Sequence, residues 1–217
     1  PNKFFQLSDD ILEDFRAEYE FARKEVAAWN SALKSRLSDS DFEKSWNLVF
    51  SGDLPNIDLP NYKPGQSVAT RKVWGPFIEK LAENFPTLVG GSADLEPSNV
   101  TTGFANMVGD FNRDNQQGRN FAYGVREFPM GTINNGISLH GGMKVFGATF
   151  FVFSDYERPA LRLRALQGLP VVSEYTHDSI FVGEDGPTHQ PIEHLMACRA
   201  IPNLLVLRPA DANEANV

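Results

Sequence analysis

The N-terminal part of the chain carries an apolar residue at every third or fourth position, which is the spacing of one face of an α-helix. The pattern begins after Ser8, where Asp9 and Asp10 occupy the place of an acidic first turn. A second, shorter stretch with the same spacing ends at Ser51 and Gly52. The apolar positions are Ile11, Phe15, Tyr19, Ala22, Val26, Trp29 and Leu33 in the first stretch, and Phe42, Trp46 and Val49 in the second.

The next segment, residues 53–65, is rich in proline and asparagine and is expected to form an extended connector. We therefore divide the chain into a helical segment with its linker (1–66) and an α/β domain (67–217). Within the domain we expect strands at 88–89, 121–125, 145–153, 169–175 and 204–207. We expect helices at 73–81, 131–140, 161–166 and 192–199, and a long polar loop before residue 121.

The run 145–153 is apolar at nearly every position, as is typical of a strand buried on both faces. Repeated strand, helix, strand order predicts a mostly parallel sheet with helices on both faces. Ligands of such folds bind at the carboxyl ends of the strands. Each polar cluster discussed below follows a predicted strand.

Composition narrows the function classes. The chain has 217 residues, 41% of them hydrophobic, and a net charge of −8, with a pI near 5.0. The hydrophobic content is enough for a substantial core, whereas the acidic balance argues against nucleic acid and anionic membrane surfaces as partners. No run is long enough to span a bilayer and the start has no secretory leader pattern, so we expect a cytoplasmic protein.

The single cysteine, Cys198, allows no internal disulfide and is expected to be a small buried filler. The chain lacks an initiator methionine and stops where a helix would begin, at 211–217. We therefore expect it to be a piece of a longer protein.

The densest group of reactive side chains is the loop 183–191, which holds Asp185 and His189. His177 closes the preceding predicted strand. A closed zinc site is unfavourable because His189 and His194 are five residues apart and prolines interrupt the loop. Hydrogen bonding to substrate hydroxyls or proton transfer is the more natural role for the loop histidines. His194 is expected to be a solvated loop residue, and His140 a core or helix-end residue.

Glu127 follows the predicted strand 121–125 and could act as an acid/base group or cap the next helix. The residues alone favour capping. Three aromatic residues, Phe150, Phe153 and Tyr156, recur at a spacing of three. Because a strand alternates its faces, this spacing indicates that the apolar run breaks into a turn near Ser154. The three rings could line a site for a flat ligand, although core packing is the more frequent explanation.

The loop 90–99 opens with two glycines and is rich in hydroxyl and amide groups. Such loops can present backbone N–H groups to phosphate, but many are only turns. Arg71 could hold an anionic group in bidentate fashion, or it could be an ordinary surface residue of a helix.

Taken together, these motifs resemble the pyrimidine-binding domain of transketolase, a thiamine diphosphate enzyme. The similarity runs from about Arg71 to the C-terminus, and the N-terminal helices resemble the segment that precedes this domain in the family. The motifs that carry the resemblance are Gly90-Gly91-Ser92-Ala93-Asp94 with Pro97-Ser98-Asn99, Val125-Arg126-Glu127-Phe128, Tyr175-Thr176-His177-Asp178-Ser179, Gly183 to Pro191, and Arg208-Pro209-Ala210-Asp211.

The resemblance implies roles for these residues. Glu127 matches the glutamate that bonds N1′ of the aminopyrimidine, while the cofactor itself performs the carbanion chemistry. The other matches are Phe150, Phe153 and Tyr156 around the pyrimidine, Asp94 near the cofactor, His177, His189 and Asp185 at the sugar hydroxyls with the histidines as candidates for proton transfer, and Arg71 and Ser98 at the sugar phosphate.

The family's Gly-Asp-Gly motif for the diphosphate and its metal is absent from these residues. The resemblance therefore implies that Mg²⁺ or Ca²⁺ binds to a separate diphosphate-binding domain, contributed by the partner subunit of a homodimer. We expect half of an active site, inactive alone, with no metal ligands of its own. The parent would move a two-carbon ketol unit between sugar phosphates of the pentose phosphate pathway.

Two alternatives remain open. Another thiamine diphosphate enzyme, such as 1-deoxyxylulose-5-phosphate synthase, shares the glutamate and a similar histidine loop, although Thr188-His189-Gln190-Pro191 favours transketolase. The chain could also be a non-catalytic module for dimerisation or regulation. The retained Glu127, His177, Asp185 and His189 argue against that alternative.

Overall fold

The computed structural model describes residue 4 and residues 6–50 and 56–216. The chain divides into two compact units, Pro1–Leu54 and Pro55–Val217.

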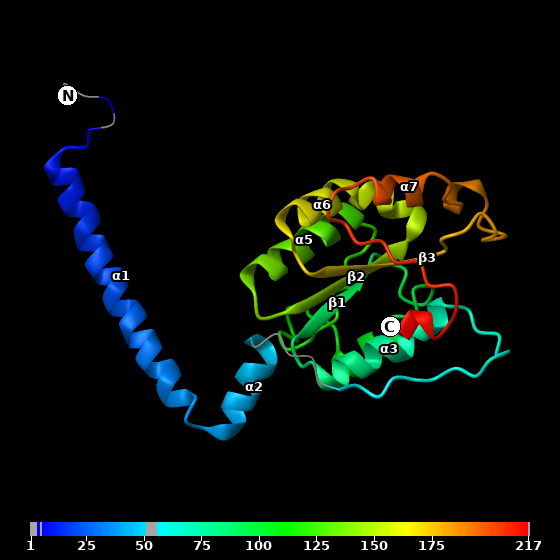
Figure 1. The fold of residues 1–217 in the computed structure, drawn as a ribbon, viewed down its shortest axis with the longest axis horizontal. Helices are drawn as coiled ribbons and strands as arrows, with labels where there is room; N and C mark the ends of the chain where they lie inside the picture. Colours follow the sequence, from blue (N-terminus) through cyan, green and yellow to red (C-terminus); the bar gives the residue numbers. More distant parts are fainter. Residues whose placement is uncertain (1–3, 5, 51–55, 217) are drawn as a thin grey trace. The chain divides into compact units, whose positions relative to one another are not determined.

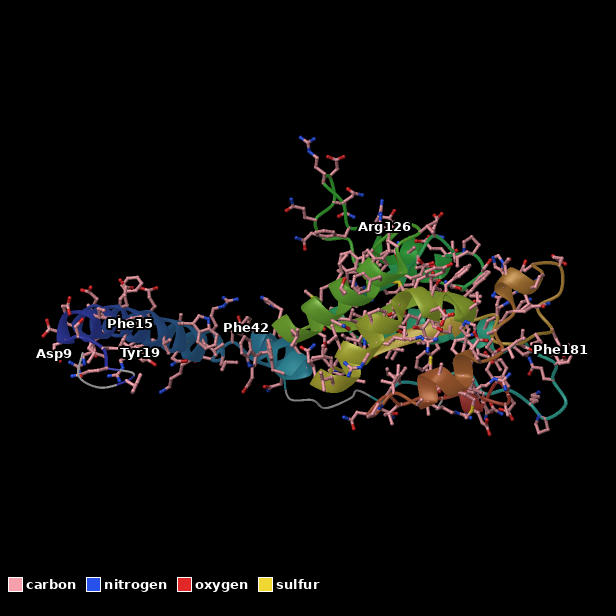
Figure 2. All side chains as sticks on the ribbon, turned by 90° about the horizontal axis from the view of Figure 1, so that it is seen from above. Asp9, Phe15, Tyr19, Phe42, Arg126 and Phe181 are labelled. Carbon is pink, nitrogen blue, oxygen red and sulfur yellow. The ribbon has the colours of Figure 1, made fainter. Side chains whose placement is uncertain are left out.

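The first unit contains the two predicted helices, α1 (Asp9–Arg36) and α2 (Ser40–Phe50). The side chain of Asp39 caps α2 by accepting backbone N–H groups at 3.0 and 3.1 Å. The apolar stripe of α1 is exposed, as the labelled side chains of Phe15 and Tyr19 illustrate in Figure 2. The predicted end of the second helix, Ser51-Gly52, lies outside the described residues.

The second unit is an α/β domain (Figure 1). Its regular elements are α3 (Arg71–Asn84), β1 (Leu88–Ser92), α4 (Thr102–Val108), α5 (Glu127–His140), β2 (Lys144–Phe150), α6 (Ser154–Gln167), β3 (Val171–Thr176) and α7 (His194–Arg199). Three short 3-10 helices complete it: η1 (Phe151–Phe153), η2 (Pro187–His189) and η3 (Glu214–Asn216).

The sheet is parallel, with strand order β1-β2-β3. Strand β2 lies in the centre, and every residue after Lys144 is buried, as its apolar run predicts. Ser92 pairs with Ala148, and Phe150 pairs with Thr176. The three strands therefore end at the same edge of the sheet.

Helices cover both faces of the sheet, which confirms the predicted fold class. On one face, the ring of Phe146 contacts Trp74 of α3 and Phe104 of α4, with centroids 5.9 and 5.0 Å apart. On the opposite face, Gly147 lies against Met130 of α5. Figure 1 shows α3 below the sheet and α5 with α6 above it.

A buried ion pair ties α6 to its neighbours. Arg164 and Glu157 lie 3.0 Å apart and are almost fully buried. Arg164 also donates to Asn135 of α5 at 2.9 Å, and the Tyr175 hydroxyl of β3 donates to Glu157 at 2.5 Å. This network satisfies charges whose burial would otherwise be costly.

Two predicted strands are wrong. Arg119 and Phe121 each make one backbone hydrogen bond with Gly90, but the segment 121–125 forms no ladder with the described residues, because the chain bends at Gly124, where φ is +65°. The apolar run 204–207 forms no ladder among the described residues, and Leu205 is 88% exposed. An apolar run can have the composition of a strand without having a neighbouring strand to pair with.

The expected polar loop before residue 121 contains a helix, α4, whose Phe104 enters the core. Other differences concern boundaries. Helix α5 begins at Glu127 rather than at 131, because Pro129 fits a first turn, where its missing N–H is not needed. The apolar run 145–153 does break, but already after Phe150, where η1 begins. Helix α7 begins two residues later than expected.

Candidate functional site

The loops that leave the carboxyl ends of the three strands carry most of the predicted site residues. Asp94 follows β1, Phe153 follows β2 and His177 follows β3. Since the strands are parallel and in register, these loops gather at one edge of the sheet.

A cluster of four predicted residues, which we call the Arg71 cluster, lies at this edge. It consists of Arg71, Ser98, His177 and Asp185. Arg71, the first residue of α3, donates from Nη1 to the backbone carbonyl of Ser98 at 3.3 Å and reaches His177 Nε2 at 3.3 Å. Asp185 Oδ2 is 3.9 Å from the same ring nitrogen. The cluster therefore presents a cation beside an imidazole and a carboxylate.

The imidazole of His177 is held tightly. Its ring stacks on Phe150 with centroids 3.8 Å apart and planes 27° apart. Its backbone adopts the left-handed region with φ 54°, which is uncommon for a residue with a side chain and frequent at functional sites. Burial lowers the pKa of His177 below 6.5, the Arg71 cation lowers it further, and Asp185 opposes the shift.

The three aromatic residues form a continuous row, hereafter the aromatic row. Phe150 and Phe153 have centroids 5.8 Å apart and planes within 3° of parallel, and Tyr156 continues the row at 6.0 Å from Phe153. The His189 ring meets both phenylalanines edge-on, at 5.9 and 5.3 Å. Phe150 is a core residue, whereas Tyr156 is 64% exposed, so core packing does not account for the whole row.

Glu127 is the first residue of α5 and does not follow a strand, which corrects its predicted position. Its side chain is 8% exposed and receives no hydrogen bond from the described residues. The neighbouring Arg126, labelled in Figure 2, donates instead to the carbonyl of Tyr123 at 2.9 Å. Glu127 lies at the positive end of the helix dipole, where a carboxylate is favoured.

Asp94 is exposed and adopts the left-handed region with φ 62°. The preceding residue, Ala93, packs in a small buried cluster with Tyr123 and with Met130 of α5. This cluster joins the end of β1 to the first turns of α5, the helix that begins with Glu127.

A cavity of about 560 Å³ opens beside the Arg71 cluster, between α3 and β3. Its walls include Arg71, Trp74, Glu174 and His177. Burial raises the pKa of Glu174 well above its ordinary value. The aromatic row and Glu127 do not line this cavity.

Two buried polar residues behind His177 were not predicted. Thr176 contacts His177 and also bonds Asn99, although Thr176 and Asn99 are 77 positions apart in sequence. The fold, and not the local sequence, brings these two residues together.

The remaining histidines serve elsewhere. His140 is an exposed residue at the end of α5, as expected. His194 was expected to be a solvated loop residue, but it is buried and bonds Asp155 at 3.0 Å. Glu193 lies near this pair, yet Asp155 is also paired with Arg158, whose charge opposes a cation there. Cys198 is buried and free, as predicted.

Among the described residues, no helix combines the length and the apolar character that a bilayer crossing requires.

The sheet, the covering helices and the loops at the strand ends define an α/β domain of the kind that binds ligands at one edge of a parallel sheet. Comparison with known proteins specifies the family. A family model described as "Transketolase, pyrimidine binding domain" matches residues 66–217. The chain is 50% identical over 215 residues to a transketolase of Geobacillus stearothermophilus and 47% identical to one of Bacillus subtilis. The chain belongs to the transketolase family.

Solved structures agree. A transketolase from Leishmania mexicana superposes with a TM-score of 0.92 at 39% identity and covers 100% of this chain. A transketolase from Pichia stipitis in complex with sedoheptulose-7-phosphate gives a TM-score of 0.92 at 37% identity, also over 100% of the chain. The matches cover 97% of this chain but only 32% of each of the two curated relatives, and 32% and 33% of the two structures. The chain thus spans about a third of the length of these proteins.

Proposed function

We propose that this chain supplies the pyrimidine-side half of a transketolase active site and that the complete enzyme transfers a two-carbon ketol unit between sugar phosphates. The observation that carries the proposal is the direct contact between the Arg71 cluster and the aromatic row, through the stacked rings of His177 and Phe150. An anion-binding group and a flat apolar surface thereby share one edge of the sheet.

The residues fit thiamine diphosphate on two grounds. The parallel rings of Phe150 and Phe153 offer a surface for a flat heterocycle. Glu127 is only 8% exposed and receives no hydrogen bond from the described residues, which leaves its carboxylate free to bond a ligand. When bound, the cofactor supplies the carbanion-stabilising chemistry. The carboxyl group of Glu127 would hold a proton at N1′ of the aminopyrimidine, and Asp94 would lie near the cofactor.

The Arg71 cluster suits the phosphate end of a sugar phosphate. Arg71 would bind the phosphate group together with Ser98. His177, His189 and Asp185, at the end of β3 and on the loop after it, would contact sugar hydroxyls, and the two histidines are candidates for moving protons near neutral pH. The structural neighbour from Pichia stipitis, described as a complex with sedoheptulose-7-phosphate, supports this substrate class.

The other half of the site would come from a diphosphate-binding domain of the partner subunit in a homodimer. That domain would hold the diphosphate and Mg²⁺ or Ca²⁺, since residues 1–217 lack the Gly-Asp-Gly motif. The chain alone would then be inactive. In the cell, the complete enzyme would act in the pentose phosphate pathway.

The test uses a full-length protein that includes these residues, with thiamine diphosphate and Mg²⁺, in a coupled assay from xylulose 5-phosphate to ribose 5-phosphate. We expect Glu127→Gln, which keeps the shape but removes the carboxylate, to lower kcat by about 10²- to 10⁴-fold. Glu83→Gln is the matched control, because Glu83 lies on α3 and pairs only with Lys80 at the surface.

Unchanged activity in Glu127→Gln would contradict the role of this residue. A wild-type protein that consumes pyruvate and glyceraldehyde 3-phosphate but transfers no ketol unit would instead be a synthase. A protein that dimerises without either activity would be a non-catalytic module.

A further inference from the structure

A series of hydrogen bonds between buried polar side chains connects the end of β1 to the Arg71 cluster. Asn99 Nδ2 donates to Ser92 Oγ at 2.8 Å, and Thr176 Oγ1 bonds Asn99 Oδ1 at 2.8 Å. Thr176 Oγ1 in turn lies 2.9 Å from His177 Nδ1. Ser92, Asn99 and Thr176 are all buried, so water does not compete for these groups. The last hydrogen bond of this series reaches His177 Nδ1, whereas Arg71 faces the other ring nitrogen, Nε2.

The chemistry of the side chains determines which atom donates and which accepts in each of these hydrogen bonds. The amide oxygen of Asn99 can only accept, so the Thr176 hydroxyl donates its single proton to it. Thr176 Oγ1 then has only lone pairs to offer His177. The bond at 2.9 Å therefore requires a proton on Nδ1 of the imidazole.

The contact at Nε2, the other ring nitrogen of His177, independently indicates the same tautomer. The Nη1 group of Arg71 lies 3.3 Å from Nε2, and a guanidinium can only donate. Nε2 must therefore carry a lone pair. If the Asn99 amide were reversed, the Thr176 hydroxyl would be free to donate to Nδ1, but a proton on Nε2 would then face the Arg71 donor. With either orientation of Asn99, the Arg71 donor therefore requires the proton to be on Nδ1.

We propose that Thr176 and Asn99 are positioning residues that keep His177 in the tautomer protonated on Nδ1, with the lone pair of Nε2 presented to Arg71. The tautomer itself does not depend on the proposed function, but its effect on phosphate binding by Arg71 does. The neutral ring then accepts one hydrogen bond from Arg71 and fixes the direction of its guanidinium, while the other N–H groups of Arg71 stay available for the phosphate of a substrate.

The orientation of the His177 ring depends on these two contacts. A half-turn about χ2 would keep the stack on Phe150, whose ring centroid is 3.8 Å away, but it would place ring carbons opposite Thr176 and Arg71 and lose both hydrogen bonds. The two nitrogens therefore face opposite sides, and Thr176 and Arg71 decide their protonation.

The direct test is a long-range ¹⁵N–¹H correlation spectrum of the 217-residue chain, which distinguishes the two neutral tautomers by their nitrogen shifts. His177→Gln serves only to assign the signals. The spectrum should show one tautomer, protonated on Nδ1. Thr176→Val keeps the shape but removes the acceptor, and we expect a mixture of tautomers. Thr176→Ser restores the hydroxyl and should restore the wild-type spectrum.

A wild-type spectrum of the tautomer protonated on Nε2 would overturn the proposal, whether or not any variant folds. A Thr176→Val spectrum identical to wild type would also overturn it, because Arg71 alone would then set the tautomer. Neither measurement uses cofactor or catalysis, so failure of the proposed function leaves the result interpretable.

Inorganic phosphate is the probe for the consequence. We expect Thr176→Val to weaken its binding at the Arg71 cluster roughly three- to tenfold, the equivalent of one net hydrogen bond, and Thr176→Ser to leave it unchanged. Equal affinity in Thr176→Val and wild type would overturn the link to Arg71. A wild-type chain that binds no phosphate there would instead contradict the phosphate site of the proposed function.

Discussion

At the scale of single residues, His177 shows how the site is assembled from distant segments. Phe150 of β2 supplies the stacking surface, Arg71 of α3 faces one nitrogen and Thr176 of β3 faces the other. The loop residues Asp185 and His189 also act on its charge, in opposite directions. Most residues of the proposed site therefore contact His177 or influence its charge.

The depressed pKa of His177 leads to a prediction about stability and pH. Burial and Arg71 favour the neutral ring in the folded chain, while Asp185 opposes them less strongly and His189 adds a little to the depression. In the unfolded chain the pKa returns to about 6.5. Because the unfolded state then binds the proton at a higher pH, this contribution to stability is present above pH 6.5 and is lost as the pH falls through the folded-state pKa.

The free energy of unfolding, measured by urea denaturation, should therefore fall less between about pH 7.5 and pH 5 in His177→Gln than in the wild type. His140→Gln is the matched control, because His140 is exposed at the end of α5 and should leave the pH dependence as it is in wild type. An identical pH dependence in His177→Gln and wild type would contradict the assignment.

The sequence contained the identities of the site residues but not their contacts. The motif blocks identified Ser98, His177 and Asp185, and Arg71 lies where the similarity begins. The structure places these four residues together. Asn99 and Thr176 lay in the same blocks without being singled out, because nothing in a sequence shows that a hydroxyl and an amide are buried against each other. Glu127 was assigned to the end of a strand because the pattern of 121–125 conceals the bend at Gly124.

At the scale of elements, helix α5 shows how close packing can reverse the usual effect of a substitution. Replacing glycine by alanine inside a helix normally stabilises it, because alanine loses less backbone entropy on folding. A Cβ at Gly131 would lie 2.7 Å from Ala160 Cβ and 2.8 Å from Glu157 Cγ, both on α6. A Cβ at Gly136 on the same helix would meet nothing within 4 Å.

We expect Gly131→Ala to destabilise the domain by about 1–3 kcal/mol, because α5 and α6 must move apart around the buried Glu157. Gly136→Ala should stabilise it by about 0.5–1 kcal/mol. Urea denaturation of both variants measures the two signs. Stabilisation by Gly131→Ala would show that the crossing of α5 and α6 is looser than these distances indicate.

Elements with a strong period were predictable, and those that depend on a partner were not. The stripe of α1 and the apolar run of β2 each define their element without reference to the rest of the chain. Helix α4 is too short for periodicity to reveal it, and its Phe104 is fixed by the contact with Phe146. The run 204–207 has strand composition, but composition supplies no neighbouring strand.

At the scale of the whole molecule, the two units differ in what holds them. Neither α1 nor α2 contains a buried residue. Among the residues that the structure describes, the buried hydrophobic ones begin at Val73 and belong to the second unit. The apolar side chains of α1 therefore add little to the stability of the chain, since burial is the main source of that stability.

This difference predicts that the second unit unfolds independently of the first. Removing residues 1–54 should leave the urea midpoint of the remaining domain unchanged, because none of the described residues in this segment belongs to the buried core. The truncated chain keeps a single tryptophan, Trp74, which packs on Phe146 with centroids 5.9 Å apart and reports on the domain by fluorescence. The full chain carries Trp29 and Trp46 in addition, so its transition is best followed through Trp74 in a Trp29→Phe/Trp46→Phe background. A clear fall in the midpoint after truncation would mean that the first unit stabilises the core, and the proposed site would then need both units to form.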